Sequence, residues 1–185
     1  MLRRFLVLAV LSASIFAPIC LADHLPPELQ ARGRPEKRLA GIVLDRSRVA
    51  DVIKMYGKPA EVRKQDKPAG LNVVDIYDYY WIKSGVKLHL LVYGGGGIKG
   101  GEYIALVEVE GSPARGAIGR TGAGLKLGDG LADVRRIYGR RFQERKLPKL
   151  NIHDVMIQWR REEFSLIAEF DGRGRIKNLS LSSPE

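Results

Sequence analysis

The chain has 185 residues, a formal net charge of +10 and one cysteine. A single cysteine excludes an intramolecular disulfide and a metal site built from several thiolates. The positive charge favours an anionic partner, such as lipid phosphates or an acidic protein, and we expect no nucleic-acid partner because the chain begins like an exported protein.

Residues 1–22 are predicted to be a signal peptide. Residues 2–4 are basic at two positions, residues 5–19 are mainly apolar, and residues 20–22 form a small-x-small cleavage motif. The apolar stretch is too short and too interrupted for a comfortable membrane span. We therefore expect export to the periplasm, with cleavage removing Cys20. Lipidation of Cys20, which would make an outer-membrane lipoprotein, is the alternative.

Residues 23–40 contain prolines and many charged residues. This composition predicts a mobile N-terminal arm. A basic arm can tether a protein to a membrane, and a solvated linker is the simpler interpretation.

The rest of the chain repeats itself. Residues 41–57 recur as residues 124–139 once a position in a turn is gapped, and internal repetition of this kind indicates a repeated structural unit. We assign repeat 1 to residues 41–110, a Gly-rich linker to residues 111–123 and repeat 2 to residues 124–185. Each repeat is small for an independent domain, so the two are expected to pack as one unit.

Each repeat is predicted to begin with a short amphipathic helix. In repeat 1, Ser47 is the expected N-cap and Gly57 the expected stop. In repeat 2, Asp129 and Gly139 take these roles. Apolar residues between the two signals recur at helical spacing, which predicts one buried face on each helix.

Three strands are predicted to follow each helix, because apolar and polar residues alternate there. Val86, Leu88, Leu90 and Val92, for example, share one face of a strand. The predicted fold class is therefore α+β, with two tandem repeats, each a helix plus a three-stranded antiparallel meander, packed as one unit. The six predicted strands are residues 76–82, 86–93, 104–109, 155–160, 164–170 and 176–181.

A shared motif links the two repeats to a known family. It consists of Leu44, Ser47, Val52, Tyr56, Gly57 and Pro59 in repeat 1, and of Leu127, Val134, Tyr138 and Gly139 in repeat 2. The motif resembles the SmpA/OmlA (BamE-type) domain of small outer-membrane proteins, and the tandem arrangement is similar in fold to the β-lactamase inhibitory protein (BLIP). The resemblance implies an exported, non-catalytic binding module of the bacterial cell envelope. The alternative that it implies is a proteinaceous inhibitor of an exported hydrolase.

The sequence offers little catalytic chemistry. Residues 95–100 match G-x-G-x-x-G, but a strand is predicted to follow where a dinucleotide site needs a helix. The stretch is interpreted as an insertion in a hairpin. His24, His89 and His153 are not spaced like metal ligands. We therefore expect no enzyme, with no catalytic residue, metal site or cofactor.

Two features indicate a partner. Asp78 and Tyr80 point away from the helix if Tyr77, Tyr79 and Trp81 pack beneath it, and a helix-free sheet face with such residues has the composition of a protein-binding surface. Basic residues crowd repeat 2 and would form an anion-facing patch. We expect a monomer that binds an envelope protein or an anionic lipid surface through Asp78, Tyr80, Arg140, Arg141, Arg145, Lys146, Arg160 and Arg161.

Overall fold

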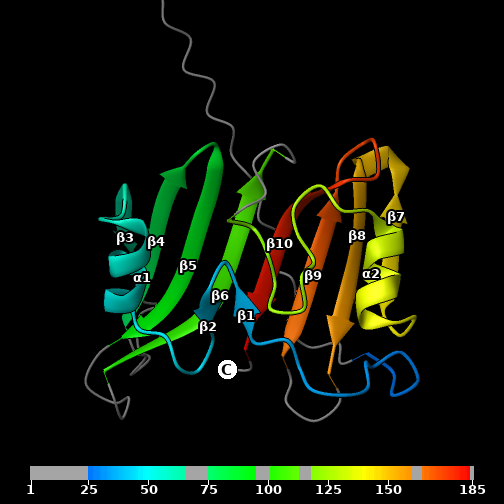
Figure 1. Ribbon diagram of the computed structural model, residues 1–185, viewed down its shortest axis with the longest axis horizontal. Coiled ribbons are helices and arrows are strands. Elements are labelled where there is room, and N and C mark those ends of the chain that lie inside the picture. Colours follow the sequence, from blue (N-terminus) through cyan, green and yellow to red (C-terminus); the bar gives the residue numbers. More distant parts are fainter. Residues whose placement is uncertain (1–24, 66–74, 95–100, 113–117, 160–163, 184–185) are drawn as a thin grey trace, which may run out of the picture.

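The fold is built on one large antiparallel sheet (Figure 1). The computed structural model describes residues 25–65, 75–94, 101–112, 118–159 and 164–183. Eight strands pair in the order β3-β4-β5-β6-β10-β9-β8-β7. Their bounds are Glu61–Lys64 (β3), Asp75–Lys83 (β4), Val86–Gly94 (β5), Glu102–Gly111 (β6), Gln143–Leu147 (β7), Ile152–Gln158 (β8), Ser165–Phe170 (β9) and Ile176–Ser182 (β10).

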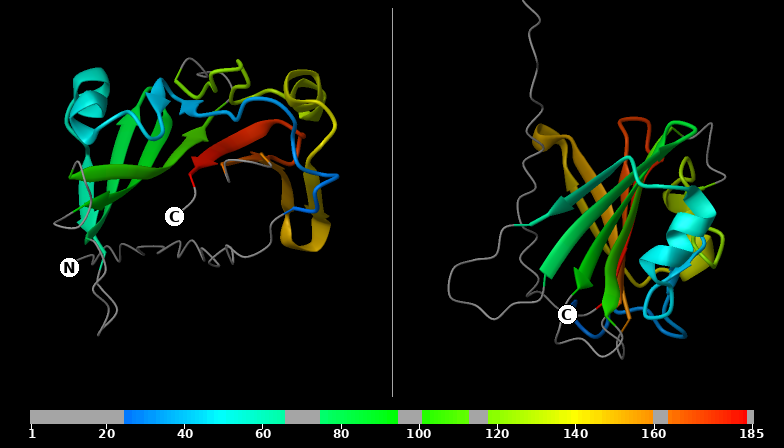
Figure 2. Two further views of the ribbon diagram at one scale, coloured as in Figure 1. Left: turned by 90° about the horizontal axis from the view of Figure 1, so that it is seen from below. Right: turned by 90° about the vertical axis from the view of Figure 1, so that its left-hand side faces the viewer.

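All other described elements are small. Helix α1 spans Val49–Tyr56 and helix α2 spans Leu131–Tyr138, while β1 (Arg38–Leu39) and β2 (Ile42–Val43) form a separate two-stranded sheet. A 3-10 turn, η2, spans Pro148–Leu150. Figure 2 shows both helices and the β1–β2 pair on one side of the large sheet, which curves away from them, so its other side is concave.

The predicted fold class, α+β with two helix-plus-three-stranded repeats, is wrong. The protein is mostly β, and strands from both halves of the chain join in a single sheet instead of forming two separate repeats. The joint is the pairing of β6 with β10, in which Val109 lies opposite Leu179 and Val107 opposite Leu181. Each half contributes four strands to the large sheet. The described residues contain two α-helices, α1 and α2. The halves therefore share one hydrogen-bonded ladder.

Strands β3 and β7, at the two edges of the sheet, were not predicted. Every residue of Glu61–Lys64 and of Gln143–Leu147 is exposed. Such strands have no buried face, so they lack the alternation by which the interior strands were recognised. Charged residues are typical of edge strands, where they discourage pairing with other chains.

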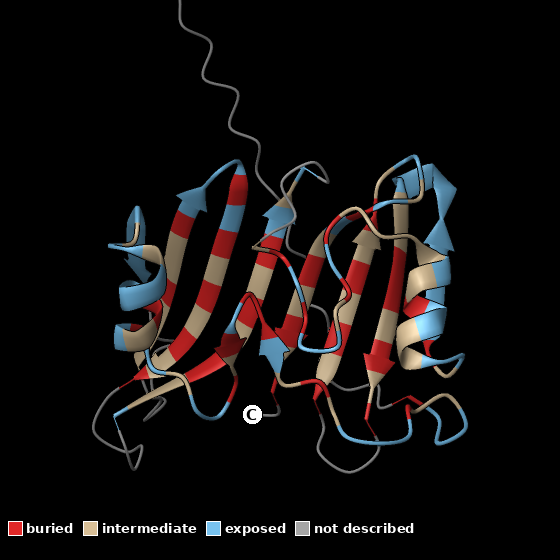
Figure 3. Cartoon of the chain, in the orientation of Figure 1, coloured by how far each residue is buried: buried red, intermediate tan, exposed pale blue. Residues whose placement is uncertain are grey.

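The core lies between the sheet and the elements above it. Along the interior strands, buried residues alternate with partly exposed ones, which appears as stripes in Figure 3. Val52 and Val134, from the two helices, are fully buried, and Trp81 and Trp159 are 3% and 4% exposed. The predicted core alternation of β5 is confirmed, since all four of its inward residues are buried.

The helix starts differ by one residue from the prediction, whereas the stops agree with it. Helix α1 begins after Arg48 rather than Ser47, and the carboxylate of Asp51 accepts a hydrogen bond from the Arg48 backbone N–H at 3.0 Å. Helix α2 likewise has Gly130, not Asp129, as its N-cap. Both helices end at a glycine with positive φ, a conformation that other residues rarely adopt.

The predicted arm makes defined contacts from Leu25 onward. The backbone N–H of Leu25 donates to the side chain of Gln158 at 2.7 Å, and the N–H of Ala31 donates to the Gln158 carbonyl at 2.8 Å. Leu25 and Leu39 are 3% and 0% exposed. Residues 25–40, here called the strap, are therefore tied to the end of β8 at one end and reach the β1–β2 pair at the other.

Several predicted segments lie outside the described residues. They are the signal peptide at residues 1–22, residues 95–100 of the Gly-rich insertion and part of the predicted linker. In the part of the chain that the structure describes, no helix has the length and apolarity to cross a membrane.

Candidate binding face

The side of the sheet that carries no helix, here called the helix-free face, runs across all eight strands. The cross-strand register places Tyr80 beside His89, His89 beside Glu108, and Glu108 beside Ser180. These residues alternate with buried core residues such as Trp81 and therefore point to the opposite side. The row continues through Ile167 and Met156 to Gln143 on β7.

The helix-free face mixes large apolar and charged side chains. Ile82 is 74% exposed. Leu91 lies opposite Leu106, and Ile167 lies opposite Met156. All four of these are partly exposed. Partly exposed apolar pairs between charged residues are a composition found in protein interfaces.

A histidine held between two carboxylates lies on this face, and this arrangement is here called the clamp. His89 Nε2 is 2.8 Å from Asp78 Oδ1, and His89 Nδ1 is 3.1 Å from Glu108 Oε2. The second oxygen of each carboxylate is also used: Gln65 donates to Asp78 at 2.9 Å, and Asn178 donates to Glu108 at 2.6 Å. The chain of hydrogen bonds spans β4, β5, β6 and β10, so it holds the two halves of the sheet in register.

The surroundings of His89 favour its charged form. Burial by itself would lower the pKa of His89, but the hydrogen bonds with Glu108 and Asp78 outweigh it and raise the pKa. Burial would raise the pKa of Glu108, yet the hydrogen bonds from His89 and Asn178 leave it lowered. Both ring nitrogens face carboxylate oxygens, so the form that these contacts stabilise is the imidazolium, which can donate one N–H to each carboxylate.

Tyr80 covers this network from the side. Its ring stacks on the His89 ring, with 4.6 Å between centroids and 9° between planes. The Arg63 guanidinium and the Lys87 ammonium each lie 5.3 Å from the Tyr80 ring centroid. Two of the residues predicted to bind a partner, Asp78 and Tyr80, thus lie on the helix-free face. Asp78 is 8% exposed and serves the network, which leaves Tyr80 as the accessible member of the pair.

The predicted basic cluster is divided between the two sides of the sheet. Arg145 points to the helix-free face, where its Nε lies 3.1 Å from Asp154 Oδ2. Lys146 points to the helix side, because it pairs with His153, whose ring stacks on the core residue Phe170.

The remaining predicted basic residues differ in exposure. Arg140 is exposed and Arg141 is half-buried, both just after α2. Arg160 and Arg161 lie outside the described residues. Within the described part of the chain, the predicted basic residues therefore do not form one positively charged patch on one face.

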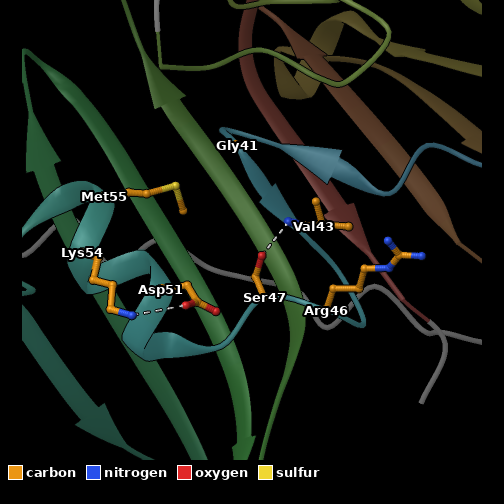
Figure 4. Close-up of a pocket in the computed structure, with 7 residues that line it drawn as sticks. All are labelled: Gly41, Val43, Arg46, Ser47, Asp51, Lys54 and Met55. Atoms are coloured by element: carbon orange, nitrogen blue, oxygen red, sulfur yellow. Dashed lines mark hydrogen bonds and ion pairs between the residues drawn. The ribbon is translucent and has the colours of Figure 1, made fainter.

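A shallow cavity of about 400 Å³ lies on the helix side, between the β1–β2 pair and α1 (Figure 4). Ser47 Oγ accepts a hydrogen bond from the Val43 N–H at 3.0 Å, and Lys54 Nζ lies 4.0 Å from Asp51 Oδ1. The lining of this cavity contains the Ser47 hydroxyl and the Asp51 carboxylate but no imidazole. A serine nucleophile needs an adjacent base, so the lining residues do not make an acyl-transfer site.

Metal binding has no support among the described residues. No group of three or more His, Cys, Asp or Glu side chains is arranged there to hold an ion. Among the described histidines, His89 is the one flanked by two carboxylates, and it already uses both ring nitrogens. Sequence reasoning did not find this network, because Asp78, His89 and Glu108 come together only through strand register.

Comparison with known proteins gives limited information. No family model matches the chain, and no curated protein matches it. A crystal structure of a DUF4309 family protein (YjgB) from Bacillus subtilis matches with a TM-score of 0.43 and 14% identity, over 78% of this chain and 83% of that chain. A likeness of this degree carries no functional argument.

The predicted resemblance to the SmpA/OmlA family and to the β-lactamase inhibitory protein is wrong. The fold is one mostly-β sheet that runs through both halves of the chain, rather than tandem helix-plus-strand repeats. The motif that suggested the resemblance consists of core residues and helix ends, which unrelated folds can share. The hydrolase-inhibitor alternative rested on this resemblance and is withdrawn with it.

Proposed function

We propose that this protein is an exported, non-catalytic binding protein that holds a partner protein against the helix-free face of its sheet. One observation carries the proposal: this face extends over all eight strands and joins accessible aromatic and apolar side chains to charges held by hydrogen-bond networks. Aromatic residues in a rigid setting are typical centres of binding energy.

The clamp around His89 supports binding rather than proton-transfer chemistry. A general base must have a free nitrogen within reach of the proton that it removes. Both nitrogens of His89 face carboxylates, and its ring is covered by Tyr80. A network with these contacts rigidifies the sheet, and a rigid surface loses less entropy when it binds.

Site-specific photocrosslinking in cells of the native host tests the proposal. A benzophenone amino acid at Ile82 or Met156, on the helix-free face, should give a covalent adduct of one defined mass. The matched control is Met55, which is 43% exposed on α1 and should give none. Adducts from position 55 alone would contradict the proposal, because they would place the partner on the helix side.

An anionic membrane surface is a second candidate, favoured by one observation. Arg140, Lys146 and Lys149 are exposed near the same end of the sheet, where α2 and β7 lie side by side (Figures 1 and 2). Each cation near an anionic bilayer contributes about 1 kcal/mol. Arg145 is left out of this set because Asp154 holds it.

We expect the triple variant Arg140→Ser, Lys146→Ser, Lys149→Ser to lose binding to phosphatidylglycerol vesicles. Three lost charges correspond to roughly a hundredfold weaker binding. Vesicle cosedimentation measures the effect. A variant with Arg46, Lys58 and Lys83 replaced by serine, which removes the same charge elsewhere, should keep most of it. If both variants lost vesicle binding equally, binding would depend on the net charge of the protein and not on a local patch of basic residues.

A further inference from the structure

A second cavity, here called the α2 cavity, lies beside the end of α2 and has a volume of about 250 Å³. Its walls come from the strap, the segment before α2, the last turn of α2 and the residue after β8. Because it lies at α2, it is on the side of the sheet opposite the helix-free face (Figure 2). A ligand in this cavity would leave the helix-free face open to a partner.

The buried part of the lining is apolar and aromatic. Ala31, Ile137 and Trp159 contribute to it, and Trp159 is 4% exposed. The Trp159 ring packs edge-to-face with the ring of Tyr138, with 6.0 Å between the ring centroids and 78° between the planes. Walls of this composition are typical of sites that bind small molecules. They suit an apolar, flat group of the ligand.

Two exposed arginines complete the lining. Arg32 and Arg34 both belong to the strap. Within the described ranges, neither guanidinium takes part in an ion pair or a side-chain hydrogen bond. The lysine of the strap differs, because Lys37 pairs with Asp45 at 3.1 Å. A guanidinium can donate two parallel N–H groups to one carboxylate, so these two arginines offer the donors that a carboxylate needs.

The lining has a positive formal charge, because it contains two arginines and one glutamate, which gives +1. The glutamate is Glu36, which accepts hydrogen bonds from three backbone N–H groups and from the Tyr138 hydroxyl, and none from a guanidinium. It therefore does not neutralise either arginine directly. The C-terminal end of α2 carries a partial negative charge, which is offset by Arg140 and Arg141, two and three residues beyond the helix.

The α2 cavity is held in shape by Glu36 and is small. The hydrogen bonds of this carboxylate join three parts of the wall: the strap, Ala123 and Tyr138. A preformed site loses less entropy when it binds a ligand. Pockets for drug-sized ligands measure about 300–1,000 Å³. A volume of about 250 Å³ therefore fits one ring system and is too small for a dinucleotide or a lipid.

We propose that the α2 cavity binds a small aromatic carboxylate. The ring of the ligand lies against Ile137 and Trp159, and its carboxylate accepts N–H groups from Arg32 and Arg34. This site is separate from the helix-free face, so it does not depend on the proposed function.

NMR of the indole N–H groups in the 15N-labelled protein tests the inference, because the chain has two tryptophans. Trp159 lines the cavity, whereas the Trp81 indole donates to the Gly57 carbonyl at the end of α1, at 2.8 Å. Adding 2-naphthoate should shift the assigned Trp159 signal and leave the Trp81 signal in place. The neutral analogue 2-naphthylmethanol should need at least a tenfold higher concentration for the same shift.

The double variant Arg32→Gln, Arg34→Gln should bind 2-naphthoate about tenfold more weakly than the wild type. The matched control is Arg120→Gln, Arg173→Gln, which removes the same charge from two exposed arginines outside the cavity and should bind like the wild type. An unchanged Trp81 signal shows that each variant is folded.

Four results would overturn the inference. The first is a Trp159 signal that does not move at about 10 mM 2-naphthoate, and the second is equal binding of the acid and the alcohol. The third is unchanged binding by the folded Arg32/Arg34 variant. The fourth is an equal loss of binding in the control variant, because the net charge of the protein would then explain the binding.

Discussion

Replacing Glu36 with alanine is expected to lower the free energy of unfolding by about 4 kcal/mol. The Glu36 side chain, which belongs to the strap, is buried and accepts four hydrogen bonds. Oε1 accepts from the backbone N–H groups of Lys37 (3.1 Å) and Arg38 (3.0 Å), and Oε2 accepts from the Ala123 N–H (2.9 Å) and the Tyr138 hydroxyl (3.0 Å). Each donor left unpaired in a buried site costs about 1–3 kcal/mol, and partial entry of water reduces the sum.

This carboxylate joins three parts of the chain that are distant in sequence. It ties the strap to the segment before α2 and to the end of α2 itself. The site is tight, because a Cβ added at Gly122 would lie 2.8 Å from Glu36 Oε1. Loss of Glu36 therefore loosens the strap and the second helix together.

Urea denaturation at neutral pH measures the effect of Glu36→Ala. Glu28→Ala is the control, since Glu28 is exposed and should change stability by less than about 0.5 kcal/mol. Glu36→Gln should lie between the two, because it keeps one acceptor oxygen and turns an NH2 group toward donors. A loss below about 1 kcal/mol for Glu36→Ala would mean that the strap is held by its apolar contacts alone.

Replacing His89 with alanine is expected to cost about 3 kcal/mol and to change the pH dependence of stability. The change leaves the carboxylates of Asp78 and Glu108 near one another without the cation between them, in a site where each side chain is mostly buried. Removing one partner of a buried ion pair costs about 3–5 kcal/mol, and the residual exposure of these groups places the effect at the lower end.

The direction of the pH dependence follows from the two pKa shifts. The pKa of His89 is raised above its unfolded value of about 6.5, so its contribution is fully present below that pH and is lost as pH rises through the folded pKa. The pKa of Glu108 is lowered, so its contribution is present above about pH 4.3 and is lost as pH falls through its folded pKa. The network is therefore strongest in mildly acidic solution.

Urea unfolding over a pH series checks this expectation in the wild type and in His89→Gln. The wild type should lose stability as pH rises from about 6 toward the folded pKa of His89, and the variant should lack this slope. Ile82→Ala is the control, because Ile82 is exposed on the same face and carries no titrating group; it should keep the wild-type slope. An unchanged slope in His89→Gln would assign the pH dependence to other groups.

Local signals in the sequence predicted local structure well. The alternation of Val86, Leu88, Leu90 and Val92 predicted a strand with one buried side, as found, because a period of two follows directly from strand geometry. The stop at Gly57 was also predicted, since positive φ is a backbone requirement that a glycine meets at low cost.

The edge strands could not be predicted in the same way. Residues of β3, such as Arg63, are exposed on both sides of the strand, so neither burial nor periodicity marks them. They are strands because β4 offers an unpaired row of backbone groups, with Arg63 opposite Asp78. Such pairing depends on the neighbouring strand, so the sequence of β3 alone does not encode it.

The sequence by itself determined the buried side of interior strands such as β5 and where the helices stop, because hydrophobic burial and backbone sterics act on each segment separately. Only the tertiary structure decided that β6 pairs with β10 and makes one sheet of two halves. Strand register also brought His89 between Asp78 and Glu108. Such alignments depend on hydrogen bonds between strands that are far apart in the chain, and a shift of one residue would turn every side chain to the other face.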